Sequence, residues 1–170
     1  MSEYYDFSDV DAFTVGAVGQ PGSRVFFLQA RGEGRRVTVK CEKQQASAIA
    51  DYLRRVLSDL PEPTDKPVPA AMELATPVDA AFVLGPVGLG YDRSSDRVLV
   101  QLEEVMEVDE EGEPIDDDDS DRGQVRVFLT RAQAAAFCEH SDAVVAAGRP
   151  ACRWCSQPMN PEGHRCPRMN

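Results

Sequence analysis

A short motif occurs twice in this chain and constrains its fold more than any other feature. Residues 13–19 read FTVGAVG, and residues 82–88 read FVLGPVG. Two further apolar segments follow each copy, and in the third segment of each half apolar residues alternate with more polar ones, which is typical of half-buried strands. These segments are 24–29 and 36–41 in the first half, and 97–102 and 124–129 in the second. The pattern predicts three strands in each half.

A helix is predicted after the third strand of each half, over residues 43–60 and 131–147. Thr130 and Gln133 have the spacing of a capping box, in which each side chain satisfies a backbone amide at the helix start. Each half is therefore predicted to be a β-β-β-α unit. Because three strands and one helix leave a sheet face uncovered, we expect the two units to pack as one α+β domain with a mainly antiparallel sheet.

The predicted organisation has four parts: a first repeat over 1–60, a linker over 61–78, a second repeat over 79–148 and a small zinc-ribbon-like tail over 149–170. In the linker, four prolines from Pro61 to Pro69 disfavour helix and favour an extended spacer. After them, Met72-Glu73-Leu74 is expected to form a short helical turn or to cover a sheet edge.

Charge is concentrated in one segment. The chain has 29 acidic and 18 basic residues, a net charge of −11, but residues 103–121 alone hold 12 acidic residues and no basic one. Like charges this close repel one another, so we expect an acidic loop inserted at the tip of the second repeat's hairpin. The overall acidity argues against a protein that coats nucleic acid or membrane surfaces. With neither an apolar run of about 20 residues nor a signal-peptide pattern, the expected location is the cytosol, away from membranes.

The strongest chemical signal lies in the tail, as Cys152-x2-Cys155-x8-His164-x-Cys166. Three thiolates and one imidazole fill the tetrahedral shell that zinc prefers in structural sites. The tail has too few apolar residues to fold unaided, so bound zinc would supply its folding free energy, on the order of 10 kcal/mol. The other two cysteines, Cys41 and Cys138, fall on predicted buried faces.

Arginines surround these ligands and are candidates for contact with a ligand or partner, although solvated charge is the commoner role of such residues. They are Arg149, Arg153, Arg165 and Arg168.

Several segments resemble an actinobacterial family of uncharacterised proteins, DUF3090. They are residues 13–30 (FTVGAVGQPGSRVFFLQA), 42–45 (EKQQ), 129–133 (LTRAQ), 147–155 (AGRPACRWC) and 161–170 (PEGHRCPRMN). The resemblance covers nearly the whole chain. It implies a cytosolic protein without an assigned activity, whose gene lies beside those of a histidine-phosphatase-like protein and a lipid-kinase-like protein. It thus hints at a phosphorylation-linked pathway.

Three functional hypotheses remain open at this point. The first is a non-catalytic interaction or regulatory protein that docks a protein partner through its zinc-stapled tail; no catalytic constellation is found in the sequence. The second is an enzyme with a site in a groove between the repeats. The third is nucleic-acid binding through the arginine-bearing tail. The polar candidates for the groove are Arg24, Gln29, Lys40 and Arg97.

Overall fold

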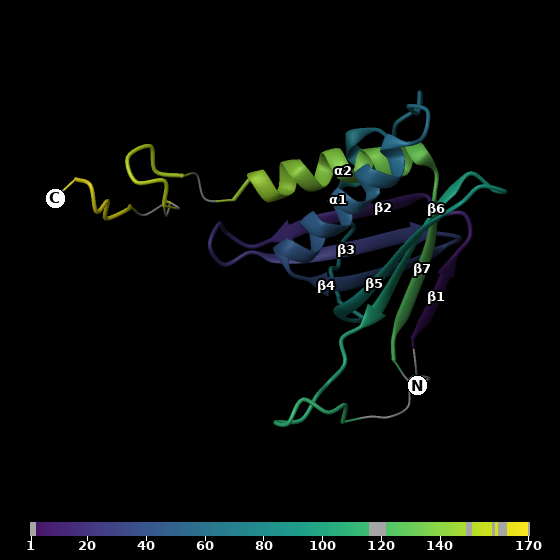
Figure 1. Ribbon diagram of the computed structural model, residues 1–170, viewed down its shortest axis with the longest axis horizontal. Helices are drawn as coiled ribbons and strands as arrows, with labels where there is room; N and C mark the ends of the chain where they lie inside the picture. Colours follow the sequence, from purple (N-terminus) through teal and green to yellow (C-terminus); the bar gives the residue numbers. More distant parts are fainter. Residues whose placement is uncertain (1–2, 116–121, 149–150, 158, 160–162, 170) are drawn as a thin grey trace.

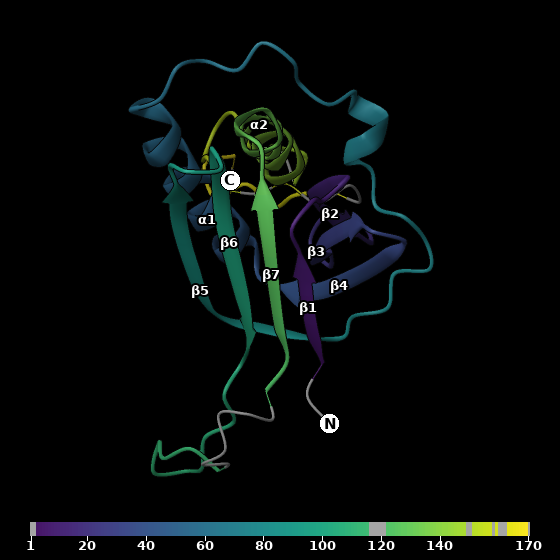
Figure 2. The same ribbon diagram turned by 90° about the vertical axis from the view of Figure 1, so that its right-hand side faces the viewer.

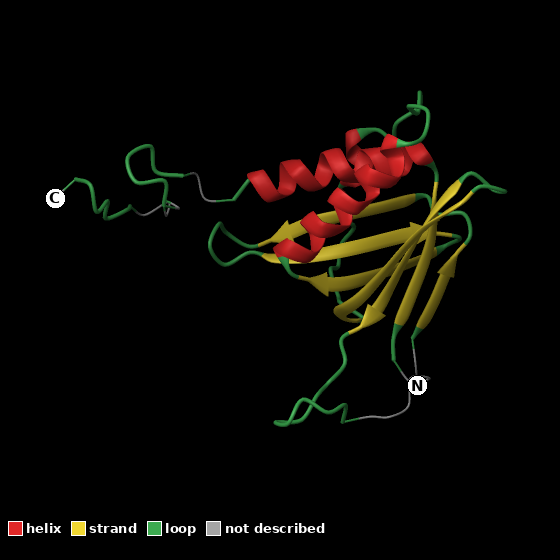
Figure 3. Cartoon of the chain, viewed as in Figure 1, coloured by secondary structure: helices red, strands yellow, loops and turns green. Residues whose placement is uncertain are grey.

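The computed structural model describes residues 3–115, 122–148, 151–157, 159 and 163–169. It is an α+β structure with two helices, as expected, and one seven-stranded sheet, which has one strand more than the six predicted (Figures 1 and 3). The strands are β1 (Tyr4–Phe7), β2 (Ala12–Val18), β3 (Val25–Gly32), β4 (Arg35–Cys41), β5 (Phe82–Asp92), β6 (Arg97–Glu104) and β7 (Gln124–Leu129); the helices are α1 (Lys43–Ser58), the 3-10 helix η1 (Pro69–Met72) and α2 (Arg131–Ala146).

The strand order across the sheet is β1-β7-β6-β5-β4-β3-β2. The pairs β1–β7 and β4–β5 are parallel and the other neighbours are antiparallel. Although β1 and β2 lie at opposite edges, only residues 8–11 separate them in the chain, so the sheet must curl strongly (Figure 2). The order β-β-β-α occurs twice, as β2–β4 with α1 and β5–β7 with α2. A duplication behind this order, and the division into repeats, linker and tail, remain predictions.

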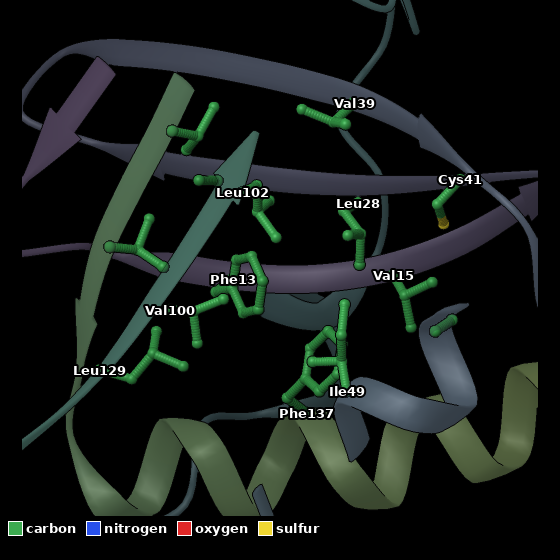
Figure 4. Close-up of a cluster of buried hydrophobic side chains, with 14 of the residues drawn as sticks. Phe13, Val15, Leu28, Val39, Cys41, Ile49, Val100, Leu102, Leu129 and Phe137 are labelled. Carbon is green, nitrogen blue, oxygen red and sulfur yellow. The ribbon is translucent and has the colours of Figure 1, made fainter. Parts of the chain in front are cut away.

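Both helices lie on one face of the curled sheet, and both halves contribute to a single core (Figure 4). At its centre the rings of Phe13 and Phe137 stack with centroids 4.9 Å apart. Alternation places Val98, Val100 and Leu102 of β6 on the buried face. The start of α2 is the capping box that the sequence predicts. The Thr130 side chain accepts from the Gln133 amide at 3.1 Å, and the Thr130 amide donates to the Gln133 side chain at 2.9 Å. Among the described residues, no helix combines the length and apolar character needed to cross a membrane.

The end of the linker covers the opposite face of β2–β4. That face carries the buried polar residues Thr14, Gln29 and Thr38. The Thr14 hydroxyl donates to the Met72 carbonyl at 2.6 Å, and the Gln29 side chain both donates to the carbonyl and accepts from the amide of Ala75, at 3.0 and 2.8 Å. A short helical turn does form here, as η1, but it covers Pro69–Met72 and shares only Met72 with the predicted turn. The segment after η1 covers the sheet instead, with Leu74 packed against Gly16 of the edge strand β2.

The acidic stretch begins later than the sequence suggests. Glu103 and Glu104 belong to β6, because the pairing of β6 with β7 continues through Glu103 opposite Gln124. Residues 105–115 then leave the sheet, and residues 116–121 of the predicted loop lie outside the described residues. The same holds for Arg149 in the tail.

Candidate metal centre

The structure brings together the four residues that the sequence predicts as metal ligands. One ligand atom from each of Cys152, Cys155, His164 and Cys166 lies within 4.8 Å of the others. The Cys152 and Cys166 sulfurs are 3.9 Å apart, and the Cys155 sulfur lies 3.2 Å from Nε2 of His164. Two pairs of ligands, separated by eight residues in sequence, therefore meet at one point.

Backbone turns shape this cluster. The amide of Ser156 donates to the carbonyl of Cys152 at 2.8 Å, and the amide of Cys152 donates to the carbonyl of Gln157 at 2.8 Å. Ser156 has a φ of 61°, in the left-handed region, which turns the chain sharply after the second thiol. At the other pair, the amide of Met169 donates to the carbonyl of Cys166 at 3.1 Å. Each ligand pair thus sits on a local turn.

The turn around Cys152 also favours its thiolate. Backbone hydrogen bonds from Cys155 and Trp154 lower the pKa of Cys152 to about 6, because amide dipoles stabilise the negative sulfur. Burial raises the pKa of Cys166. A thiolate is the form that binds a metal, so one ligand of this set is already in its binding form at neutral pH.

The donor set fits zinc. Three sulfurs and one nitrogen are the soft and borderline ligands that zinc takes in tetrahedral structural sites. All four positions would be filled by the protein, which leaves none for water or a substrate. Zn²⁺ held by Cys152, Cys155, His164 and Cys166 would cross-link the two turns.

Burial in this module differs from that of an ordinary small domain. Cys152 and Cys166 are 4% and 9% exposed, whereas Trp154 and Met169 are 52% and 70% exposed and Met159 is only half-buried. Two of the three thiols are therefore buried, while no large apolar side chain among the described residues of the tail is fully buried. Apolar burial alone would stabilise such a module poorly.

The described arginines of the tail surround its surface. Arg153, Arg165 and Arg168 are exposed, and the Arg153 guanidinium lies 5.2 Å from the centre of the Trp154 ring. This distance is that of a cation–π contact. The module therefore presents an aromatic ring beside one positive charge, and it carries two further exposed arginines.

The polar residues proposed for a groove between the repeats do not form a cluster of hydrogen-bonded side chains. Arg24 donates to the carbonyl of Val144 at 3.0 Å, near the end of α2. Gln29 is held by Thr38 and Ala75, and Arg97 donates to neighbouring turn carbonyls. Lys40 is exposed on β4. Each of the three hydrogen-bonded side chains stabilises a different local structure.

A cavity of about 440 Å³ does lie between α1, α2 and the linker, and it was not predicted from the sequence. Three of its charged groups are paired: Lys66 with Glu139 at 2.6 Å, and Arg54 with Asp142. The Cys138 thiol beside it donates to the carbonyl of Ala50, and burial raises its pKa to about 11. A protonated, hydrogen-bonded thiol is a poor nucleophile, which supports the packing role predicted for this residue.

Fold and cluster together define an α+β protein with a C-terminal Cys3His group suited to a metal ion. The family model described as "Protein of unknown function (DUF3090)" matches residues 5–166, nearly the whole chain, and the protein belongs to this family. This confirms the resemblance seen in the sequence. No curated protein and no solved structure matches the chain.

Proposed function

We propose that this protein is a cytosolic, non-catalytic interaction or regulatory component whose tail becomes a docking tip when it binds structural zinc. The observation that carries the proposal is the convergence of Cys152, Cys155, His164 and Cys166 beneath an exposed aromatic and basic surface. A site closed by four protein ligands is normally structural, which favours binding over catalysis.

The ion's contribution would be folding free energy. Zinc supplies four strong bonds that fix the two turns, and those turns hold Trp154 and its neighbouring arginines in one arrangement. Pre-ordering a docking surface lowers the entropy that binding must overcome. A place in a phosphorylation-linked pathway rests on the family resemblance alone.

The test combines metal analysis with partner capture. Full-length protein purified under reducing conditions without chelator should contain one zinc per chain, and it should capture a partner from native lysate. The Cys152→Ser/Cys155→Ser variant should lose both the metal and the partner. Cys41→Ala/Cys138→Ala is the matched control, since it removes two thiols from the body and should keep both properties. Metal-free wild-type protein, or unchanged capture by the tail variant, contradicts the proposal.

Nucleic-acid binding by the same module is a second candidate, favoured by the stacked Arg153–Trp154 pair. Binding of single-stranded oligonucleotides should then weaken steeply as salt rises. The chain's net charge of −11 opposes this candidate, and salt-insensitive or absent binding would eliminate it.

A further inference from the structure

Large apolar side chains on the described surface gather in two places. Eleven of them are exposed, and six belong to two short segments: Val105, Met106, Val108 and Ile115 lie in one, Trp154 and Met169 in the other. Exposed apolar groups that gather in this way are typical of interaction surfaces, whereas single ones are ordinary.

The first segment, residues 105–115, will be called the acidic turn. It contains five acidic residues and no basic one: Glu107, Asp109, Glu110, Glu111 and Glu113. Its shape is fixed locally, because the carboxylate of Asp109 accepts from the amides of Glu111 and Glu113 at 2.9 Å. Val108 also bridges to Pro114. The acidic turn therefore presents apolar side chains beside carboxylates on an ordered backbone.

The second surface is the tail module, which combines Trp154 and Met169 with Arg153, Arg165 and Arg168. The two surfaces match in both respects: each offers exposed apolar groups, and their charges are opposite. Such a pairing buries apolar area at its centre while the charged rim sets orientation and specificity.

The tether to α2 disfavours contact within one chain. Five residues, 147–151, join α2 to Cys152, and a chain of this length reaches at most about 18 Å. In sequence, the acidic turn and the module are separated by β7 and α2, about 20 and 24 Å long, which run in different directions (Figure 1). Figures 1 and 2 show the acidic turn and the module leaving the body at separate corners.

We propose that the tail module of one copy docks on the acidic turn of a second copy, so that two chains exchange tails in a closed, symmetric pair. Two equivalent contacts then form in each dimer, so that each tail module and each acidic turn has a partner on the other chain. This proposal rests on the proposed function, because only the metal-folded module presents the arginines and Trp154 together.

The contact should be weak and sensitive to salt. Beyond about 8 Å, at physiological salt, the repulsion between two chains of net charge −11 is largely screened, so the close pairing of unlike charges dominates. Two small patches fall at the low end of interface sizes, where complexes are transient. We expect dimerisation with a dissociation constant on the order of 10 μM.

A charge exchange tests the proposal by sedimentation velocity on zinc-loaded, full-length protein. Arg153→Glu/Arg165→Glu/Arg168→Glu and Glu110→Lys/Glu111→Lys/Glu113→Lys should each weaken self-association at least tenfold, because each puts like charges opposite one another. An equimolar mixture of the two variants should restore dimers, since every contact then joins unlike charges. Wild-type dimers should weaken several-fold between 0.05 and 0.5 M salt.

Two controls match the charge changes outside both surfaces. Lys40→Glu/Arg55→Glu/Arg93→Glu and Asp59→Lys/Glu62→Lys/Asp65→Lys replace exposed residues and should leave dimerisation within twofold of wild type. Zinc content and circular dichroism are measured on every variant. The proposal is overturned if the zinc-loaded wild type stays monomeric up to 1 mM or if the mixture fails to dimerise. A tail that folds back on its own chain would give the first of these results. A zinc-free module would instead overturn the proposed function.

Discussion

The body and the tail of this protein use cysteine in opposite ways. In the body, Cys41 and Cys138 are buried among apolar side chains, where burial raises the pKa of Cys41 to about 12. In the tail, Cys152 lies on a turn whose amides lower its pKa to about 6. The same side chain is thus a neutral packing group in one region and an anionic candidate ligand in the other, and the backbone around it decides which.

The two regions also differ in what stabilises them. The body has a shared core in which Phe137 is fully buried, whereas in the tail Trp154 and Met169 are exposed and Met159 is only half-buried. The body should therefore depend on apolar burial and the tail on its metal ion. If each region can lose its structure while the other stays folded, the contrast is sharpened. If both regions unfold together, the contrast is broken.

Metal removal should have the largest effect, and only on the tail. Trp154 is the single tryptophan of the chain, so its fluorescence reports on the tail alone. A strong chelator should lower its fluorescence anisotropy and open the tail to protease, as binding free energy on the order of 10 kcal/mol is lost. Far-UV circular dichroism, dominated by α1 and α2, should change little. A collapse of the dichroism signal on chelation would show that the body also depends on the metal.

Phe137→Ala should have the next largest effect, on the body. Removing a ring stacked on Phe13 leaves a cavity and should lower the free energy of unfolding by about 3–5 kcal/mol, measured by urea titration. Phe128→Ala is the matched control; this ring is only half-buried, so the loss should be clearly smaller. Below the unfolding transition, both variants should keep their zinc. Loss of zinc from folded Phe137→Ala would contradict the independence of the two regions.

Sequence reasoning predicted the parts of the molecule that repeat simple rules. Alternation in segments such as 36–41 identified strands, and the Thr130–Gln133 spacing identified a helix start. The four clustered residues were identified because Cys-x-x-Cys and His-x-Cys are local patterns whose turn geometry leaves few alternatives. These signals are short-range, so a single sequence carries them in full.

The features that were not predicted depend on contacts far apart in the chain. Thr14 and Gln29 look like solvent-facing strand residues, and only the carbonyls of Met72 in η1 and of Ala75 after it explain why they are buried. β1 was missed because four residues carry little periodicity and its pairing with β7 spans the whole chain. The cavity beside Lys66 needs both helices and the linker in place.

Per pH unit, alkaline conditions should give the smallest effect, and they should act on the body while the tail keeps its metal, which is the opposite of chelation. Because burial raises the folded-state pKa values of Cys41 and Cys138 above the unfolded value near 9, their contribution to stability is intact below pH 9 and is lost as pH rises towards 11–12. Each thiol should lower the free energy of unfolding by about 1.4 kcal/mol per pH unit across that window.

The Tyr91 phenol, whose pKa is raised by its hydrogen bond to Asp96, acts in the same direction, so the measurement uses a Tyr91→Phe background. In that background Cys41→Ala/Cys138→Ala should flatten the urea-derived slope, while the tail keeps its zinc because alkaline pH favours thiolate ligands. A slope that the double substitution leaves unchanged would place the alkaline sensitivity elsewhere and remove the contrast between the two kinds of cysteine.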